Sequence, residues 1–201
     1  MLIPLRLSAQ TDEQLMQRAS RGSERAFEEL YNRHARRLQG FFARRLGQDS
    51  DLAADFMHDV FLRLYAAREN YHEGRPFRPW LYTIAYNLCK NHLRNQLATL
   101  AEEPDVVADA DIELQIDASL LHDALRDALG RLPEPYAMIF SLHYEEELTV
   151  PQISQITALP EGTVKSRLHK AMNIVKQHLK KYENRYPSHR PNGPPAARRA
   201  K

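Results

Sequence analysis

Six polar or basic side chains near the C-terminus have the chemistry to bind DNA. They are Thr163, Lys165, Ser166, Arg167, His169 and Lys170. In a helix, four of them would share one face with Asn173, while Lys165 and Arg167 would flank that face. The opposite face would be an apolar stripe formed by Val164, Leu168, Ala171, Val175 and Leu179. Hydroxyl, amide and cationic groups placed in this way suit base edges and phosphates in a major groove. The alternative is a helical hairpin with a solvated basic face.

A second candidate site mixes aromatic and basic residues. Its first part contains Tyr71, His72, Arg75, Phe77 and Arg78, followed by Trp80 and Tyr82. Its second part, at helical spacing, contains Thr83, Tyr86, Asn87, Lys90 and Arg94. Rings interleaved with Arg, Lys and Asn suit single-stranded DNA, because bases stack on the rings and cations bind the phosphates. The competing interpretation places Trp80 and Tyr82 in the hydrophobic core.

Three aspartates spaced four residues apart, Asp51, Asp55 and Asp59, would lie on one face of a helix. Like charges at this spacing destabilise an isolated helix by about 0.2–0.5 kcal/mol per pair. Nearby, Phe61 and Leu62 add more apolar surface than one buried stripe requires. A surface that is both acidic and apolar suits a protein partner with a basic docking site, and a solvated charged face is the alternative.

The elements that must position these residues are helices. Glycine is scarce and strand-like alternation is nearly absent, so the sequence predicts an all-α fold. A first module should contain helices over residues 12–20, 23–46, 50–68 and 79–96, with Ser23 as an N-cap. A second module should contain helices over residues 120–129, 133–145, 149–157 and 160–181, with a capping box from Thr149 to Gln152. A turn of about four residues separates the last two, which is a helix-turn-helix pattern.

The net charge of +2 over 201 residues hides an uneven distribution. Residues 1–95 carry 15 basic and 11 acidic side chains, and residues 149–201 carry 11 basic and two acidic ones. Residues 96–119 contain seven acidic and no basic side chains. We therefore predict helical domains over residues 11–96 and 118–182, a flexible acidic linker over 97–117 and a disordered, basic, proline-rich tail over 183–201.

Several classes of protein are excluded by composition. The single cysteine, Cys89, forms no internal disulfide, and we expect it to be a small buried apolar residue. No segment has the roughly 18–20 apolar residues of a membrane span, and the apolar start is too short for a signal peptide, so we expect a cytoplasmic protein without membrane insertion. No metal-ligand cluster, phosphate loop or nucleophile elbow is present, so we predict no metal, no cofactor and no enzymatic activity. We expect His34, His92 and His178 on the surface.

These motifs together resemble the extracytoplasmic-function (ECF) class of bacterial sigma factors in the sigma-70 family. Residues 12–34 (DEQLMQRASRGSERAFEELYNRH) are similar to the start of the family's region 2. Residues 51–65 (DLAADFMHDVFLRLY) resemble its polymerase-docking helix, and residues 75–96 (RPFRPWLYTIAYNLCKNHLRNQ) the segment that reads the minus-ten element. Residues 131–179 resemble region 4, in which GTVKSRLHKA (residues 162–171) is the most specific run.

The resemblance implies a role for each candidate site. Core RNA polymerase would bind through Asp51, Asp55, His58, Asp59 and Phe61. Promoter DNA at the minus-ten element would contact Asn70, Tyr71, His72, Arg75, Phe77, Tyr82, Tyr86, Asn87, Lys90, Asn91 and Arg94. The minus-thirty-five element would be read by the six C-terminal residues that open this subsection. The family often has Gln at the position of His58. An anti-sigma factor is a further implied partner, and the response is expected to follow a stress or envelope signal.

Two other functions fit parts of the same pattern. A two-domain helix-turn-helix regulator would act without core polymerase and would need a ligand-sensing N-terminal module, which the acidic stripe and the aromatic-basic segment fit poorly. A protein-interaction adaptor without a DNA role would tolerate the loss of charge from the last helix. A transcription assay with core polymerase would distinguish a sigma factor from both alternatives.

Overall fold

The protein is all-α, as predicted. The computed structural model describes residues 7–47, 49–100 and 119–185, and every regular element within these ranges is helical. The α-helices are α1 (Asp12–Ser20), α2 (Glu24–Arg45), α3 (Ser50–Ala66), α4 (Phe77–Leu100), α5 (Ser119–Gly130), α6 (Glu134–Phe140), α7 (Val150–Thr157) and α8 (Glu161–Arg185). Two 3-10 helices, η1 (Leu7–Ala9) and η2 (Arg68–Asn70), and one π-helix, η3 (Ser141–Glu145), complete them.

The helix starts follow the capping residues that the sequence supplies. Thr11 forms a capping box with Gln14 at the start of α1, and Ser23 caps α2 through the backbone N–H of Ala26. Asp49 accepts hydrogen bonds from two backbone N–H groups of α3. The predicted capping box of Thr149 and Gln152 opens α7. Each cap satisfies N–H groups that lack a partner within the helix, which contributes about 1 kcal/mol.

Two elements differ from the sequence prediction. The helix expected over residues 79–96 begins at Phe77 and extends to Leu100. Its start is fixed from outside, because the backbone N–H of Phe77 donates to the carboxylate of Glu13 on α1 at 3.1 Å. The helix expected over residues 133–145 is α-helical only to Phe140 and continues as a π-helix through Glu145.

Contacts divide the described residues into two compact units. The first contains α1 to α4 together with residues 141–164, and the second contains α5, α6 and α8 from Lys165 onward. The domain boundaries that the charge pattern predicts, at 97–117, are not tested by this division and stay a prediction. The predicted linker beyond Leu100 and the tail beyond Arg185 lie outside the described residues.

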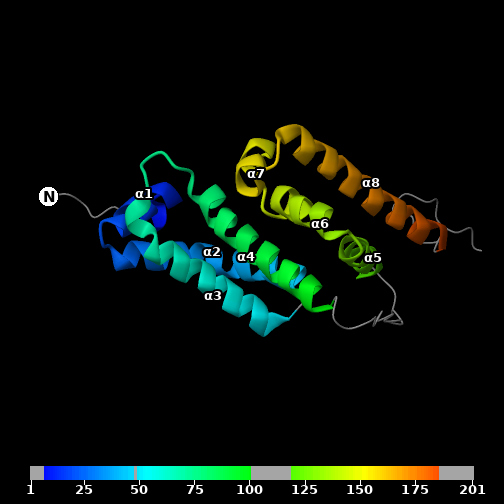
Figure 1. Cartoon of the computed structure of the whole chain (residues 1–201), viewed down its shortest axis with the longest axis horizontal. Helices are drawn as coiled ribbons and strands as arrows, with labels where there is room; N and C mark the ends of the chain where they lie inside the picture. Colours follow the sequence, from blue (N-terminus) through cyan, green and yellow to red (C-terminus); the bar gives the residue numbers. More distant parts are fainter. Residues whose placement is uncertain (1–6, 48, 101–118, 186–201) are drawn as a thin grey trace, which may run out of the picture. The chain divides into compact units, whose positions relative to one another are not determined.

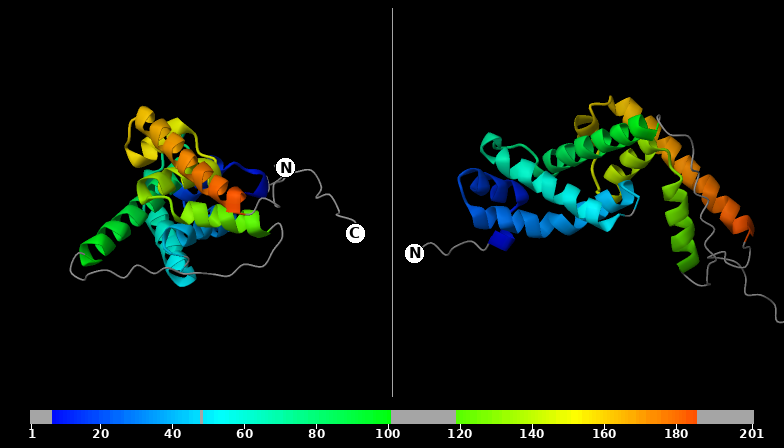
Figure 2. Two further views of the ribbon diagram at one scale, coloured as in Figure 1. Left: turned by 90° about the vertical axis from the view of Figure 1, so that its right-hand side faces the viewer. Right: turned by 60° about the horizontal axis from the view of Figure 1, so that its bottom comes forward.

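In the first unit, α2 and α3 lie side by side, and α1 and α4 pack against them (Figure 1). The two further views in Figure 2 keep α2 and α3 adjacent. The core between them consists of fully buried side chains: Leu15, Leu30, Leu38, Phe41, Phe42, Val60, Leu64, Phe77 and Leu81. Burying one such side chain stabilises the fold by about 1.5–3 kcal/mol. Cys89 is also fully buried, as predicted.

His34 was expected on the surface, and the structure shows this to be wrong, because only 9% of the residue is exposed. Its Nε2 lies 2.7 Å from a carboxylate oxygen of Asp12, whose other oxygen accepts from Arg33 at 3.0 Å. The ring also lies 5.2 Å from that of Phe77. The burial of Asp12 opposes its ionisation, but the hydrogen bonds and charges of His34 and Arg33 outweigh it and hold the pKa of Asp12 below its usual value. This cluster joins α1 to α2 beside the first residue of α4.

In the second unit, α5, α6 and α8 enclose a small apolar core. Ala128, Leu132, Ala137, Ala171 and Val175 are buried in it. Larger side chains close its edges, among them Tyr136, whose ring lies under the ammonium group of Lys170 at 5.3 Å. The apolar stripe predicted along α8 is therefore the face that packs. Its opposite face is left for solvent or a ligand.

Candidate functional site

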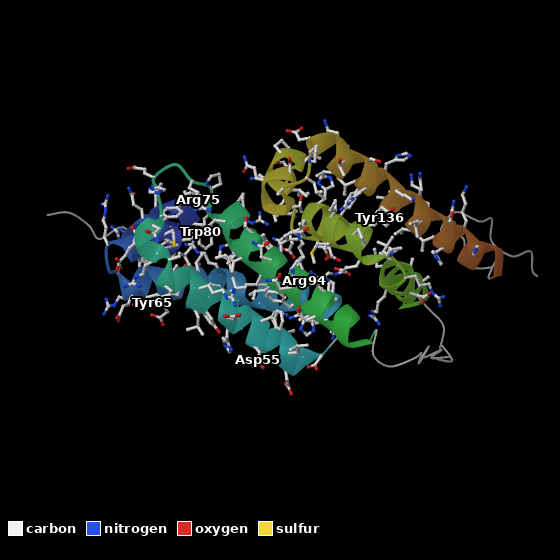
Figure 3. The ribbon with its side chains drawn as sticks, in the orientation of Figure 1. Asp55, Tyr65, Arg75, Trp80, Arg94 and Tyr136 are labelled. Atoms are coloured by element: carbon white, nitrogen blue, oxygen red, sulfur yellow. The ribbon has the colours of Figure 1, made fainter. Side chains whose placement is uncertain are left out.

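The acidic stripe lies on α3, and the structure exposes most of it. Asp51 and Asp55 are exposed, and Figure 3 labels Asp55 on α3. Asp55 forms no ion pair with any residue that the structure describes. Asp59 is half-buried and pairs with Arg63 one turn later, at 2.9 Å. His58 is exposed, and its Nε2 lies 3.1 Å from the hydroxyl of Tyr31 on α2. A negatively charged surface therefore runs along α3. Its exposed aspartates, Asp51 and Asp55, lie in the N-terminal half of the helix, and Asp59 is paired with Arg63.

The apolar part of this surface is contributed by Leu62 rather than Phe61. Phe61 is only 4% exposed, and its ring packs against those of Phe27 and Tyr31. Leu62 is 70% exposed, and Tyr65 one turn later is 37% exposed. The sequence indicated surplus apolar surface at positions 61 and 62, but the spacing did not distinguish the two. The structure identifies Leu62 as an additional candidate contact.

A stacked aromatic pair joins the loop before α4 to the first turn of this helix. The ring of Tyr71 stacks on that of Trp80 at 5.4 Å. The guanidinium of Arg75 lies 4.8 Å from the centre of the Trp80 ring (Figure 3). The Tyr71 hydroxyl donates to the carbonyl of Arg75 at 2.5 Å. Burial and the charge of Glu13 raise the pKa of Tyr71 to about 12. The exposed residues of this stretch are Asn70, His72 and Arg75, while Tyr71 and Phe77 are buried.

The predicted strand-binding face of α4 is exposed along its C-terminal part. Asn87, Lys90, Asn91 and Arg94 are exposed, and Tyr86 is half-buried. Tyr82 differs, because it is only 1% exposed and its hydroxyl donates to the carboxylate of Glu146. Burial, the negative charge of Glu146 and this hydrogen bond raise the pKa of Tyr82 far above its usual value. Of the residues on α4 that the sequence proposes for DNA, Tyr82 is thus covered in this conformation, and its role stays a prediction.

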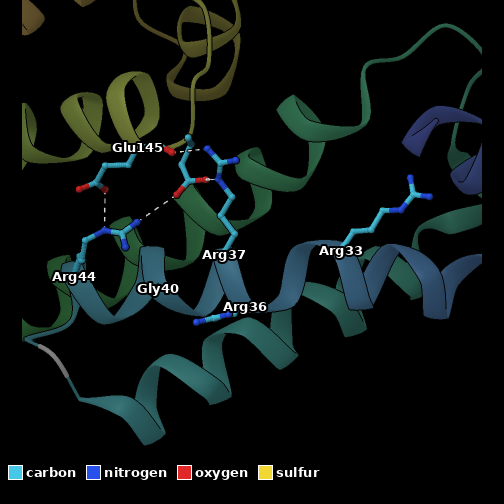
Figure 4. Close-up of a pocket in the computed structure, with 7 residues that line it drawn as sticks. Arg33, Arg36, Arg37, Gly40, Arg44 and Glu145 are labelled. Carbon is cyan, nitrogen blue, oxygen red and sulfur yellow. Dashed lines mark hydrogen bonds and ion pairs between the residues drawn. The ribbon is translucent and has the colours of Figure 1, made fainter. Parts of the chain in front are cut away.

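A cluster of arginines, which the sequence did not single out, surrounds Glu145 and Glu146. Arg37 and Arg44 of α2 donate to this pair of residues (Figure 4). Arg78 of α4 donates to the backbone carbonyl of Glu146. Desolvation lowers the pKa of Arg37, but the charge and hydrogen bond of the fully buried Glu146, with the charges of Tyr82 and Glu147, together outweigh it and raise this pKa. Arg37 and Arg44, together with Arg33 and Arg36 of the same helix, line a pocket of about 500 Å³. The signal that could have found it is the spacing of Arg33, Arg37 and Arg44 along one side of the helix.

The six predicted residues on α8 lie around one accessible face. Lys165, Ser166, His169 and Lys170 are exposed, and Thr163 and Arg167 are half-buried. The residues beneath them, Val164 and Leu168, are buried, as are Ile153 and Ile156 of α7. Ala158 ends α7 in the left-handed conformation, with φ of 56°, and so forms the turn of the helix-turn-helix. This arrangement leaves a polar and basic helix face suited to a DNA groove.

Two other classes of site were sought in the part of the chain that the structure describes. No group of three or more His, Cys, Asp or Glu residues there could hold a metal ion. Within the same residues, no helix has the length and apolarity needed to cross a membrane.

Two family models match the chain. The model for sigma-70 region 2 matches residues 30–99, and the model for sigma-70 region 4 matches residues 122–174. The first range contains α3, α4 and the loop between them, and the second contains the helix-turn-helix. The matches therefore cover all three candidate surfaces.

Characterised relatives extend the similarity over most of the chain. RNA polymerase sigma factor CarQ of Myxococcus xanthus is 31% identical over 170 residues, which is 84% of this chain and 97% of CarQ. The ECF RNA polymerase sigma-E factor of Haemophilus influenzae is 29% identical and covers 84% of this chain and 95% of its own length. The ECF RNA polymerase sigma factor SigW of Bacillus subtilis is 25% identical over 82% of this chain and 95% of its own length.

Solved structures show the same fold. CnrH, in complex with the cytosolic domain of CnrY, matches with a TM-score of 0.62 and 23% identity, over 85% of this chain and 97% of CnrH. The sigma factor RpoE from Bartonella quintana, in complex with the anti-sigma factor NepR, matches with a TM-score of 0.63 and 20% identity, over 77% of this chain and 96% of RpoE.

Sigma factors are transcription initiation factors without enzymatic activity, and they bind core RNA polymerase and promoter DNA. The two region models, in the order of the family, and a relative of 31% identity over nearly its whole length agree with the helical architecture and the three surfaces. This chain belongs to the ECF subfamily of the sigma-70 family.

Proposed function

We propose that this sigma factor uses α3 to bind the clamp of core polymerase. The contact residues would be Asp51, Asp55, His58 and Asp59, with Leu62 as the exposed apolar contact and Phe61 supporting it from beneath. The acidic charge would guide the approach of a basic partner surface, and Leu62 would contribute apolar burial. The observation that supports this assignment is the 70% exposure of Leu62 on the same helix as the exposed Asp51 and Asp55.

Replacing Leu62 with serine is expected to weaken the affinity for core polymerase about tenfold, because the apolar contact is lost. The melting temperature should stay unchanged, since the side chain is largely exposed in the free protein. Replacing Phe61 with alanine should instead lower stability by about 3–5 kcal/mol. Titration of polymerase with labelled sigma factor, beside thermal unfolding, separates the two. Full affinity of the Leu62 variant would contradict its role.

The DNA contacts are assigned to two further surfaces. The minus-ten strand would pass the exposed residues Asn70, His72 and Arg75 of the loop and the exposed face of α4. Tyr71, Phe77 and Tyr82 are buried, so they would act by shaping this surface or by becoming exposed in the holoenzyme. The minus-thirty-five element would be read by α8. The single observation that carries promoter recognition is the polar and basic face of α8 within a region 4 match.

The experiment that tests the whole function is transcription in vitro. Core polymerase plus this protein, on genomic fragments, should produce new transcripts that start at discrete promoters. Core polymerase alone should not produce them. An absence of new transcripts would support the adaptor interpretation. Promoter-specific binding of DNA without polymerase would support the two-domain regulator.

Replacing Arg167 with alanine is expected to reduce promoter-specific transcription about tenfold or more, since one DNA contact is worth about 1–3 kcal/mol. Binding to core polymerase should be unchanged. The matched control is Lys180→Ala on the same helix, which removes an exposed charge at the far end and should retain transcription. The assay compares transcript yield with polymerase affinity for each variant. A parallel loss of both in the Arg167 variant would assign region 4 a different role.

We further propose that an anti-sigma protein restrains this chain in the cytoplasm until a stress or envelope signal arrives. The support is the similarity to CnrH and RpoE, both solved with a bound regulatory protein. The division into a region 2 domain over residues 11–96 and a region 4 domain over 118–182 is part of the same proposal, and the two family models support it.

A further inference from the structure

The arginine cluster on α2 and α4 donates hydrogen bonds to carboxylate and carbonyl oxygens of Glu145 and Glu146. We define it as the arginine cradle, formed by Arg37, Arg44 and Arg78. Arg37 Nε donates to the Glu146 carboxylate at 2.7 Å, and Arg44 donates to it at 3.3 Å and to the Glu145 carboxylate at 2.8 Å. Arg37 also donates to the carbonyl of Glu145 at 2.5 Å, and Arg78 donates to the carbonyl of Glu146. Three cations therefore converge on the oxygens of two residues.

Glu146, which occupies the arginine cradle, is unusually buried for a charged residue. Glu146 is 0% exposed, and each of its two carboxylate oxygens accepts from an arginine. Arg37 and Arg44 are themselves 40% exposed, so the cradle lies at the surface and only its occupant is covered. If residues 145 and 146 left, three cationic groups would face solvent together with the exposed Arg36, which lines the same pocket.

Gly40 of α2 leaves room for this arrangement. Glycine within a helix costs about 1 kcal/mol relative to alanine, yet this 22-residue helix contains it between Arg37 and Arg44. A Cβ atom at Gly40 would come within 3.1 Å of a guanidinium nitrogen of Arg44. The missing side chain therefore lets Arg44 lie along the helix and reach the carboxylates.

We propose that the arginine cradle is a binding site for the phosphates of promoter DNA, and that Glu145 and Glu146 occupy it as phosphate mimics in the polymerase-free protein. Planar guanidinium groups bind phosphate and carboxylate oxygens through the same donor geometry. The inference rests on the DNA-binding function of the chain and adds to it a site outside the three surfaces already assigned.

The position of the cradle favours nucleic acid over an acidic protein segment. From Arg78, the residues Tyr82, Tyr86, Lys90 and Arg94 follow at intervals of four along α4. Residues four apart are neighbours on a helix, but each step of four turns by about 40°. This row therefore winds from the cradle past the buried Tyr82 to the exposed Lys90 and Arg94 of the proposed minus-ten surface. A DNA strand on the minus-ten surface would contact the cradle only after Glu146, which also covers Tyr82, had moved away. The free chain would thus bind DNA weakly, and release of the two glutamates would create the rest of the site.

The test is DNA binding by the full-length chain without polymerase. Fluorescence anisotropy with a short labelled single-stranded oligodeoxynucleotide compares the wild type with Glu146→Gln and Glu145→Gln. The first should bind about tenfold more tightly, because it frees charge at two arginines, and the second should show a smaller gain. Glu145→Gln also guards against misfolding, since its side chain is partly exposed and no fully buried charge is removed. The control Glu28→Gln removes an exposed carboxylate from α2 outside the cradle and should have little effect.

A second set of variants locates the gain. Adding Arg37→Gln and Arg44→Gln to Glu146→Gln should abolish the increase in affinity and reduce the salt dependence by the equivalent of about two phosphate contacts. Adding Arg25→Gln, which removes an exposed charge from the same helix, should leave the increase intact. The proposal is overturned if neither glutamate variant binds DNA more tightly, or if the gain survives loss of both arginines. Equally tight binding of a labelled poly-glutamate peptide would overturn it in favour of an acidic protein ligand. None of these readouts depends on transcription.

Discussion

Replacing Asp55 with arginine is expected to abolish co-purification of this sigma factor with core RNA polymerase. Asp55 is exposed in the middle of the acidic stripe on α3, and the described structure gives it no ion pair. A docking surface for a basic partner would meet a like charge there, and such a contact costs several kcal/mol, equivalent to at least about a hundredfold loss of affinity. The measurement is the amount of polymerase retained by immobilised sigma factor.

The folded state should not change in this variant. Removing one aspartate from the series Asp51, Asp55 and Asp59 relieves repulsion along the helix, and exposed substitutions usually alter stability by less than about 0.5 kcal/mol. The matched control is Glu28→Arg, the same charge reversal at an exposed position of α2. That control should bind polymerase normally. Normal binding by the Asp55 variant would refute the clamp assignment, and equal loss in both variants would show a nonspecific charge effect.

Replacing Asp12 with alanine is expected to destabilise the protein by about 2–3 kcal/mol, the largest stability effect that we predict for a single charged residue. The substitution leaves the buried His34 without its carboxylate partner, which carries a desolvation cost. It also removes one acceptor from Arg33, which keeps Glu29 and two backbone carbonyls. Asp59→Asn breaks the exposed pair with Arg63 and should cost no more than about 1 kcal/mol. Urea unfolding of both variants provides the comparison.

The same carboxylate makes stability depend on pH in a defined direction. Because the folded state lowers the pKa of Asp12 below its ordinary value, its contribution is fully present above that ordinary value and is lost as the pH falls through the folded value. The wild type should therefore lose stability relative to the Asp12 variant on acidification below about pH 4. A constant difference between the two across this range would show that Asp12 acts through packing alone.

Local signals in the sequence were sufficient for most of the fold. Capping residues and apolar spacing are short-range features, and so Thr149 with Gln152 predicted the start of α7, and Val164, Leu168 and Ala171 predicted the buried side of α8. His34 was placed wrongly because its partner Asp12 lies 22 residues away, on another helix. The early start of α4 has a similar origin in the distant Glu13.

The candidate sites were predictable to the level of a helix face but not of single side chains. Residue spacing correctly grouped the aspartates of α3, yet it could not show that Phe61 packs inward while Leu62 stays exposed. The spacing of the arginines along α2 was visible in the sequence, but their contact with Glu146 could not be predicted, since Arg37 and Glu146 are 109 positions apart. Contacts of that separation depend on tertiary packing, and helical periodicity contains no information about them.

The pairing of Leu62 with aspartates on α3 also bears on how copies of the free protein behave toward one another. An exposed apolar side chain favours self-association, and the neighbouring carboxylates give every copy the same negative patch. Repulsion between these patches keeps the copies apart over a range of about 8–10 Å at ordinary ionic strength, and salt shortens it. In the free protein, the aspartates therefore oppose self-association through Leu62. The same charges attract a basic partner, so they favour the specific complex over contacts between copies.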